Sequence, residues 1–203
     1  MRLALLALFA FAVTVRADDT DDFLKADNWK GIKEYWTVDA KARTVTGKTE
    51  ADPKFNTFLC SQQDYGDFDM SFKVKMTGPK ANSGIQVRSS IVDKEKFIVA
   101  GPQCDMGAQY WGSLYGEKVG GMMKASDAKM VKKLVKVDDF NDYSLSVKGN
   151  HITITVNGET MTDGDYPMQP DKKPMPKTGI IAFQIHAGGP MTAEFKEIKF
   201  SKK

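Results

Sequence analysis

The stretch from Phe68 to Met76 alternates strictly between apolar and polar residues, and this alternation limits the folds available to the chain. Successive side chains of a β-strand point to opposite faces, so a strand here would have one apolar and one polar face. A helix would scatter the same apolar residues around its circumference. The stretch is therefore predicted to be a half-buried strand of a sheet.

Similar stretches recur along the chain and are separated by turn signals. Residues 143–148 and 152–156 flank a Gly149-Asn150 turn, which is typical of a β-hairpin. Strands are also expected over 35–38, 43–47, 57–60, 178–186 and 191–200, with helix confined to 22–25 and 125–135. Nine or ten short strands predict an all-β fold, an antiparallel two-sheet β-sandwich of the jelly-roll type with one polar, concave face.

The beginning of the chain has the character of a signal peptide. Arg2 precedes a largely apolar run from Leu3 to Val15, and Ala17 offers a cleavage position before Asp18. The run is shorter than the roughly 20 apolar residues that a membrane span needs. We therefore expect residues 1–17 to be removed, and residues 18–203 to form a single β-sandwich domain that is secreted or periplasmic and has no membrane span.

Charge and cysteine content exclude several classes of function. The chain has 29 basic and 26 acidic residues and no basic block interleaved with aromatic residues, so nucleic acid is not an expected partner. Cys60 and Cys104 are the only cysteines, which excludes a zinc site built on cysteines. Whether these two cysteines form a disulfide stays open at the level of sequence.

Three strand-like stretches carry polar side chains where a core strand would have none: residues 84–88, 101–105 and 182–186. Alternation directs one set of side chains to a single face of each stretch. That set comprises Gln86, Arg88, Gln103, Asp105, Gln184 and His186. If the three strands are neighbours, this polar face is a candidate site.

The residue types on this face favour a polyhydroxylated ligand. Glutamine amides donate and accept hydrogen bonds at once, and histidine titrates in the range useful for acid–base catalysis. A buried Arg88 requires a partner, which is either an oxygen-rich ligand or Asp105 in a structural ion pair. Tyr115 and Trp111 offer apolar surfaces on which a sugar ring can stack.

The least strand-like part of the chain runs from Gly112 to Asp139. It follows the stretch that contains Gln103 and Asp105, and it contains Glu117 between glycines. Long loops in compact domains are commonly functional, so this segment is predicted to form a rim over the polar face. The alternative is a surface excursion without a role in the site.

Four ordered motifs resemble the 3-keto-disaccharide hydrolase family, whose members are exported proteins with a concanavalin-like or laminin-G-like jelly roll. The motifs are Asn82 to Ser89 (NSGIQVRS), Gly101 to Met106 (GPQCDM), Gly112 to Glu117 (GSLYGE) and Gly179 to Gly188 (GIIAFQIHAG). Each motif alone is weakly specific, whereas the four in this order are more so. The resemblance extends over nearly all of the chain after residue 17.

The resemblance implies cleavage of glycosidic bonds in sugars oxidised at C3, by removal of the C2 proton, elimination and hydration. It implies either His186 or Asp105 as the base, Arg88 as a clamp for the enolate oxygen and Glu117 as an acid. Substrate binding would fall to Gln86, Gln103, Gln184, Tyr115 and Trp111. No cofactor is certain, and a divalent metal held by Asp105, Glu117 and His186 stays open. The alternatives are a non-catalytic carbohydrate-binding module on the same fold and an adhesion or scaffold role.

Overall fold

The computed structural model describes residues 18–165 and 175–203. The predicted signal peptide, residues 1–17, lies outside the described residues. Within the described ranges, no helix combines the length and the apolar character needed to cross a membrane.

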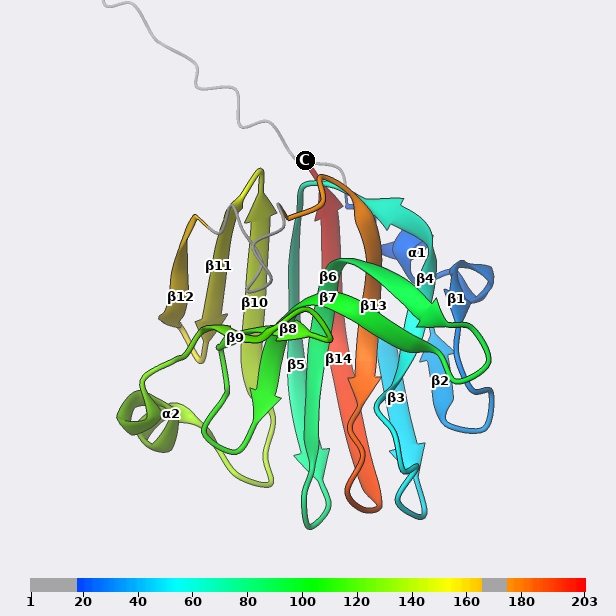
Figure 1. Ribbon diagram of the computed structural model, residues 1–203, viewed down its shortest axis with the longest axis horizontal. Helices are drawn as coiled ribbons and strands as arrows, with labels where there is room; N and C mark the ends of the chain where they lie inside the picture. The colour runs from blue at the N-terminus through cyan, green and yellow to red at the C-terminus, as the bar shows by residue number, and fades with distance from the viewer. Residues whose placement is uncertain (1–17, 166–174) are drawn as a thin grey trace, which may run out of the picture.

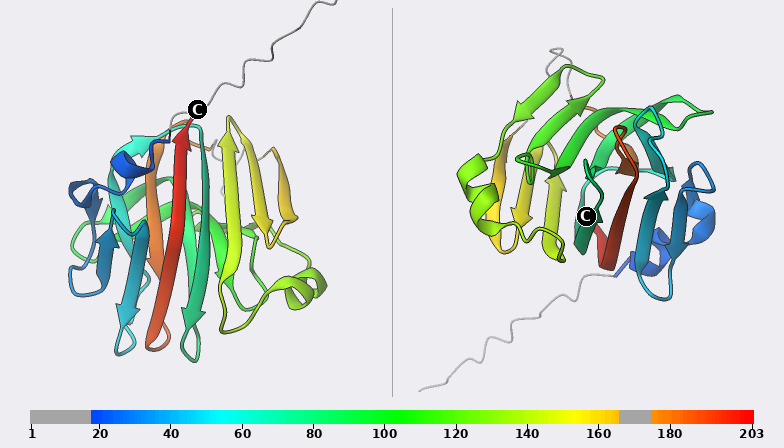
Figure 2. Two further views of the ribbon diagram at one scale, coloured as in Figure 1. Left: turned by 180° about the vertical axis from the view of Figure 1, so that it is seen from behind. Right: turned by 90° about the horizontal axis from the view of Figure 1, so that it is seen from below.

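The described chain folds into two antiparallel sheets of seven strands each, which lie face to face (Figures 1 and 2). The first sheet has the order β1 (Trp29–Lys30), β4 (Thr57–Tyr65), β13 (Gly179–Ile185), β6 (Asn82–Asp93), β7 (Ile98–Gly107), β8 (Leu114–Glu117) and β9 (Gly121–Lys124). The second has the order β12 (Glu159–Asp165), β11 (His151–Val156), β10 (Asn141–Lys148), β5 (Phe68–Thr77), β14 (Met191–Lys202), β3 (Thr44–Thr49) and β2 (Trp36–Asp39). The predicted fold class is confirmed.

The helices are short and lie at the margins of the sandwich. They are α1 (Thr20–Phe23), the 3₁₀ turn η1 (Ala26–Asn28) and α2 (Ala128–Leu134). Asp127 caps α2 by accepting hydrogen bonds from the backbone N–H groups of Lys129 and Met130. Figure 1 shows α2 at one edge of the sandwich, on the side of β9 and β12.

The alternating stretch predicted from sequence is β5, whose Phe68, Met70, Phe72 and Val74 are all buried. Their side chains belong to the main apolar core between the two sheets. The predicted hairpin is also present, because β10 pairs antiparallel with β11 from Tyr143↔Val156 to Lys148↔His151. Alternation of apolar and polar residues therefore identified these strands correctly, because each of them has one buried face.

One sequence expectation changes in the structure, and one open question is answered. The segment from Gly112 to Asp139, in which only a helix over 125–135 was expected, contains β8 and β9 as well as that helix, α2. Glycines interrupt the alternation of apolar and polar residues in this segment, so its strands could not be identified from sequence. Pairing of β8 with β7 provides hydrogen-bond partners for its backbone N–H and C=O groups. Cys60 and Cys104 are both buried and free. Cys104 lies in the core between the sheets, whereas Cys60 lies in a smaller apolar cluster.

A bulge in β6 sets the shape of the first sheet. The pairing of β6 with β7 shifts register between Gln86 and Ser90, and Arg88 within this interval has a φ of 45°. A Cβ at Gly179 of β13 would lie 2.5 Å from the carbonyl carbon of Arg88, so this close approach requires glycine. Beyond the bulge, Phe97 of the β6–β7 turn packs on the cluster that contains Cys60.

Candidate functional site

The three polar strands are neighbours in the first sheet, in the order β13, β6, β7. Gln86 of β6 lies opposite both Gln103 of β7 and Ala182 of β13. Ile85, Cys104 and Phe183, which alternate with the polar residues, lie in the core between the sheets. Except for Arg88, the polar side chains therefore project from the outer face of the first sheet, as the alternation predicted.

This outer face contains a cavity of about 450 Å³. Its wall combines amide, carboxyl, imidazole and phenol groups with a single thioether. The lining residues are Asn56, Asn82, Gln103, Asp105, Tyr110, Tyr115, Glu117, Met122, Gln184 and His186. We call it the polar cavity. It unites six of the predicted site residues: Gln103 and Asp105 of β7, Tyr115 and Glu117 of β8, Gln184 of β13, and His186 directly after β13.

Asp105 lies on the wall of the polar cavity with only 7% of its surface exposed. Its carboxyl Oδ1 accepts a hydrogen bond of 2.6 Å from Gln103 Nε2, and Gln103 Oε1 accepts one of 2.8 Å from Gln86 Nε2. Tyr143 of the second sheet donates to the Asp105 backbone carbonyl over 3.2 Å. Gly84, opposite Asp105 in β6, leaves the space that the Gln103 amide occupies.

Burial raises the pKa of Asp105 to about 7. The hydrogen bond from Gln103 opposes this rise, and the nearby charge of Glu117 adds to it. Burial also raises the pKa of Glu117, although Lys118, Asn56 and His186 oppose the shift. The cavity therefore contains two carboxyl groups whose proton affinity is raised, an arrangement typical of acid–base chemistry near neutral pH.

Gln184 supplies a hydrogen-bond donor that nothing else in the described chain uses. Its Oε1 accepts from Gln103 Nε2 over 3.2 Å, but its Nε2 is fully buried and has no partner among the described residues. An unpaired buried amide is costly, so such a group in a cavity wall marks a position where a ligand oxygen can bind.

The glutamine chain can run in either of two directions, because an amide turned by 180° exchanges its donor and acceptor. In one direction Gln86 donates to Gln103, which donates to Asp105. Turned over, the Gln86 nitrogen donates to Ser89 Oγ at 2.7 Å and to the Pro102 carbonyl at 3.0 Å. If Gln103 turns with it, its oxygen faces Asp105, which must then carry a proton. The direction of the chain is thus coupled to protonation of Asp105.

His186 follows β13 and lies between the polar cavity and a second, adjoining cavity. Its Nδ1 lies 2.5 Å from the carbonyl oxygen of Ala187. A carbonyl only accepts hydrogen bonds, so Nδ1 carries a proton, and Nε2 is the ring nitrogen left free to exchange a proton with a ligand. The backbone N–H of Ala187 donates in turn to Asn56 Oδ1 over 3.0 Å, which fixes this loop.

Arg88 lies away from the polar cavity because the bulge in β6 turns its side chain to the end of the sandwich. It is 2% exposed and forms an ion pair of 2.5 Å with Asp67 rather than with Asp105. It also donates to the carbonyl oxygens of Gly66 at 3.2 Å and Gly149 at 2.5 Å. Protein groups therefore satisfy this guanidinium, and it does not join the other candidate residues.

Two further predicted residues, Gln86 and Trp111, do not line the polar cavity. Gln86 is fully buried beneath the cavity and acts through Gln103. Trp111, 5% exposed, lines the second cavity instead. Sequence reasoning missed Asn56, Asn82 and Met122, which also line the polar cavity. Asn82 opens the first family-like motif, whereas no local signal distinguishes Asn56, which the β3–β4 connection brings to the site.

The described ranges contain no group of three or more His, Cys, Asp or Glu side chains arranged to hold a metal ion. The ligand set left open by the sequence, Asp105, Glu117 and His186, is therefore not a metal centre in this arrangement. The groups in this cavity that can exchange protons or hydrogen bonds with a ligand include its amides, carboxyls and imidazole.

Comparison with solved structures shows similar folds at low sequence identity. A protein from Parabacteroides distasonis assigned as a glycosyl hydrolase is 17% identical with a TM-score of 0.62, over 87% of this chain and 94% of that chain. The carbohydrate-binding module CBM66 from Bacillus subtilis is 10% identical with a TM-score of 0.58, over 86% and 96%. A Bacillus subtilis protein with a galectin-like fold is 8% identical with a TM-score of 0.61, over 87% and 90%.

Comparison at the level of sequence families is more specific. Curated proteins gave no match to this chain. The family model of the 3-keto-alpha-glucoside-1,2-lyase-like domain matches residues 19–201, which includes both sheets and every residue of the polar cavity. This extent agrees with a carbohydrate-related function. The chain belongs to the family of 3-keto-alpha-glucoside-1,2-lyase-like domains.

Proposed function

We propose that this protein cleaves the glycosidic bond of 3-keto-glycosides by elimination at C1 and C2, followed by addition of water. One observation carries the proposal: a buried carboxyl group with a pKa near neutrality, Asp105, shares a cavity with the unpartnered amide nitrogen of Gln184. Such an elimination needs a base and, within reach of it, a donor for the oxygen that becomes negative.

The reaction starts at the proton on C2, which the neighbouring C3 ketone acidifies. Asp105 takes this proton, and the C2–H electron pair forms the C2–C3 double bond of an enolate. Gln184 Nε2 donates to the enolate oxygen, and Glu117, whose pKa is raised by burial, is a second donor when it carries a proton. This assignment gives the amide and the carboxyl the role that the sequence had assigned to Arg88.

The enolate then collapses and expels the leaving group. The C3 carbonyl reforms, a C1–C2 double bond appears, and the C1–O bond breaks with its electron pair on the departing oxygen. His186 is the proposed acid for that oxygen: while its Nδ1–H stays on the Ala187 carbonyl, Nε2 carries a second proton and gives it to the departing oxygen. His186 lines both the polar cavity and the cavity beside it, so it can reach that oxygen. Water next adds across C1 and C2: Nε2 of His186, which has lost its proton, takes one from the water as the water oxygen bonds to C1. Asp105 gives a proton to C2, which yields the free 3-keto sugar and restores both side chains.

The proposal also includes the setting of the reaction. We expect the segment 1–17 to direct export and the remaining chain to act as one β-sandwich domain outside the cytoplasm. Its partner is a carbohydrate, and Gln103, Asn82 and Tyr115 are available to the ring and its hydroxyl groups.

A turnover assay tests the proposal directly. The protein is incubated with 4-nitrophenyl 3-keto-glucoside and with the unoxidised parent glucoside, and release of 4-nitrophenol is followed over time. The expected result is release from the keto sugar alone and its loss in His186→Ala. His151→Ala is the matched control, because His151 is the exposed second histidine and pairs with Asp163 and Asp165. Saturable binding without release would instead identify a carbohydrate-binding module.

A further inference from the structure

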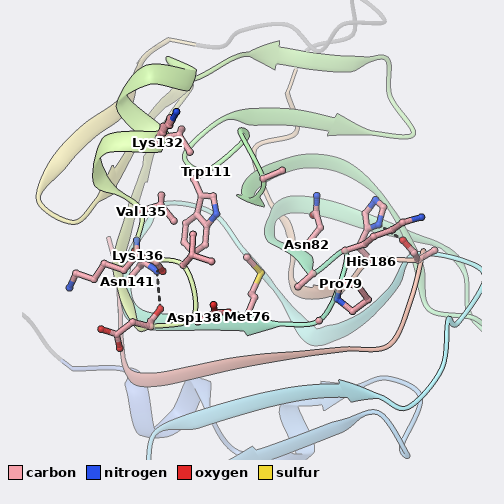
Figure 3. Close-up of a pocket in the computed structure, with 18 residues that line it drawn as sticks. Met76, Pro79, Asn82, Trp111, Lys132, Val135, Lys136, Asp138, Asn141 and His186 are labelled. Atoms are coloured by element: carbon pink, nitrogen blue, oxygen red, sulfur yellow. Dashed lines mark hydrogen bonds between the residues drawn. The ribbon is translucent and has the colours of Figure 1, made fainter.

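A second cavity of about 630 Å³ adjoins the polar cavity, and Asn82 and His186 line both. It lies between the β5–β6 turn, Trp111 and the segment from α2 to the start of β10. Figure 3 shows Trp111 and Val135 on one side of this cavity, with Asn82 and His186 across from them. A molecule that passes His186 therefore has room on either side of it.

The chemistry of the two cavities differs. Apolar side chains form much of the second wall: Met76, Trp111, Val131 and Val135. Asn141 also lines it but is fully engaged, since its Nδ2 donates to the carbonyls of Lys136 and Asp139 while its Oδ1 accepts from the Lys136 N–H and Asn157 Nδ2. The lysines that line the cavity are exposed. The second cavity therefore offers a sugar ring few neutral hydrogen-bonding groups that are free to pair with its hydroxyls. It offers an apolar ring a surface of Met, Trp and Val side chains to pack against.

We infer that the second cavity is the subsite for the leaving group and that it selects apolar, ring-containing aglycones. The inference rests on the proposed function, since it assigns the 3-keto sugar to the polar cavity. It puts the scissile bond beside Asn82 and His186, where the two cavities meet. The selected substrate class is accordingly aryl or arylalkyl 3-keto-glycosides rather than 3-keto-disaccharides.

The test compares leaving groups of similar acidity, so that differences report binding rather than bond strength. Methyl, benzyl and 2-naphthylmethyl 3-keto-glucosides are compared with a 3-keto-disaccharide. From methyl to naphthylmethyl we expect KM to fall roughly tenfold or more while kcat changes little, because the ring is buried before the transition state. Equal KM values for the methyl and naphthylmethyl substrates would overturn the inference and leave the proposed function intact.

A variant localises the effect. Val135→Gln adds a polar group to the apolar wall and is expected to abolish most of the naphthylmethyl advantage. Turnover of the methyl substrate by the same variant reports whether it is folded. Val92→Gln is the matched control, since Val92 is 56% exposed and does not line either cavity. An unchanged naphthylmethyl advantage in Val135→Gln would contradict the assignment.

A binding measurement keeps the inference testable if no glycoside is turned over. 2-Naphthylmethanol is titrated into the protein while the indole N–H signal of Trp111, identified with Trp111→Phe, is followed by NMR. A saturable shift that Val135→Gln weakens is the expected result. No shift at millimolar alcohol would overturn the subsite, whereas a shift without any glycoside turnover would overturn only the proposed function.

Discussion

Two buried charged clusters lie on either side of the bulge in β6, and they differ in how completely the protein satisfies them. Arg88 has a carboxylate, Asp67, and the carbonyls of Gly66 and Gly149 as partners. Asp105 has one amide partner for its side chain, and the neighbouring Gln184 has a buried nitrogen without a partner among the described residues. The first cluster is complete without a ligand, whereas the second is not.

This difference separates a structural charge from a candidate catalytic one. Both groups are almost fully buried, so burial alone does not distinguish them. The pKa of Arg88 is lowered by burial while Asp67 counteracts the shift, and that of Asp105 is raised to about 7. A charged group with complete protein partners stabilises the fold, and one that faces unsatisfied donors in a cavity is available for chemistry. The predictions below test this contrast.

The largest expected effect is the loss of turnover in Asp105→Asn. The substitution removes the proposed base but keeps an oxygen that can accept from Gln103. We expect kcat for 3-keto-glucoside cleavage to fall about 10²- to 10⁴-fold, as for other general bases. The steady-state rate measures it, and Asp67→Asn is the control for loss of a carboxylate. A decrease of less than tenfold would remove Asp105 from the mechanism.

Arg88→Met is expected to act on stability and not on chemistry. It removes the guanidinium donors from Asp67, which still accepts from the Gly149 N–H, and from the carbonyls of Gly66, Gly149 and Pro176. The loss should lower the free energy of unfolding by about 2–4 kcal/mol. Urea denaturation measures the loss, and kcat per folded molecule should stay within about twofold. Arg43→Met, which breaks exposed pairs with Asp18 and Asp21, should cost much less. Loss of turnover in an Arg88→Met protein that remains stably folded would show that Arg88 takes part in the reaction and is not only a structural charge.

Asp105 should also make stability depend on pH. Its folded pKa of about 7 lies above the ordinary value of 3.8, so the folded state binds the proton more tightly. The stabilisation is complete below about pH 4 and is lost as the pH rises through about 7. Asp105→Asn should therefore be more stable than the parent at pH 8 by roughly 1–3 kcal/mol. Equal stability of the two proteins at pH 8 would show that this carboxyl is not strained by burial.

Gly84→Ala tests how closely the amide must be positioned. The added Cβ would lie 2.6 Å from Gln103 Cγ, so the Gln103 side chain must shift away from Asp105. We expect a decrease in kcat on the order of tenfold together with some loss of stability, because Gln103 is buried and both its Cγ and its amide must move. Gly66→Ala is the matched control, with no atom nearer than 3.6 Å to its new Cβ. Full activity of Gly84→Ala would show that this hydrogen bond is dispensable.

The smallest expected effect is a change in pH profile in Gln86→Leu. Turned toward the Pro102 carbonyl, the Gln86 amide favours the direction of the chain in which Asp105 is protonated. Its removal should lower the pKa of Asp105 and move the acid limb of kcat/KM to lower pH by about half a pH unit. A lower rate with an unmoved acid limb would indicate a packing role only. Gln63→Leu, on an exposed glutamine, controls for the loss of an amide.

The sequence predicted the strands whose faces differ in polarity, and the fold class followed from them. It left the adjacency of the three polar strands as a condition for a site, and only the structure shows them side by side, in the order β13, β6, β7. It could not locate Arg88, since a bulge reverses side-chain direction without any change in the alternating pattern. The strands β8 and β9 escaped detection because glycines interrupt their pattern, although the segment was expected to form the rim.

Other parts of the site depend on tertiary contacts. Asn56 lies far in sequence from the polar strands and reaches the cavity because its amide binds Glu117 and the N–H of Ala187. The unpaired nitrogen of Gln184 depends on where Gln103 directs its own amide, which only the folded arrangement defines. The local sequence pattern predicts which face of a strand a side chain occupies. Whether that side chain finds all its hydrogen-bond partners depends on the folded protein.

The most direct test of the central claim is the fate of the C2 proton during a single turnover in D₂O. An elimination through Asp105 predicts one deuterium at C2 of the released 3-keto sugar, because the proton taken by Asp105 exchanges with D₂O before hydration returns a hydrogen to C2. Product incubated with Asp105→Asn protein measures spontaneous exchange and should remain largely protonated over the same interval. Release of aglycone with the original C2 proton retained, or equal cleavage of the unoxidised glucoside, would contradict the account.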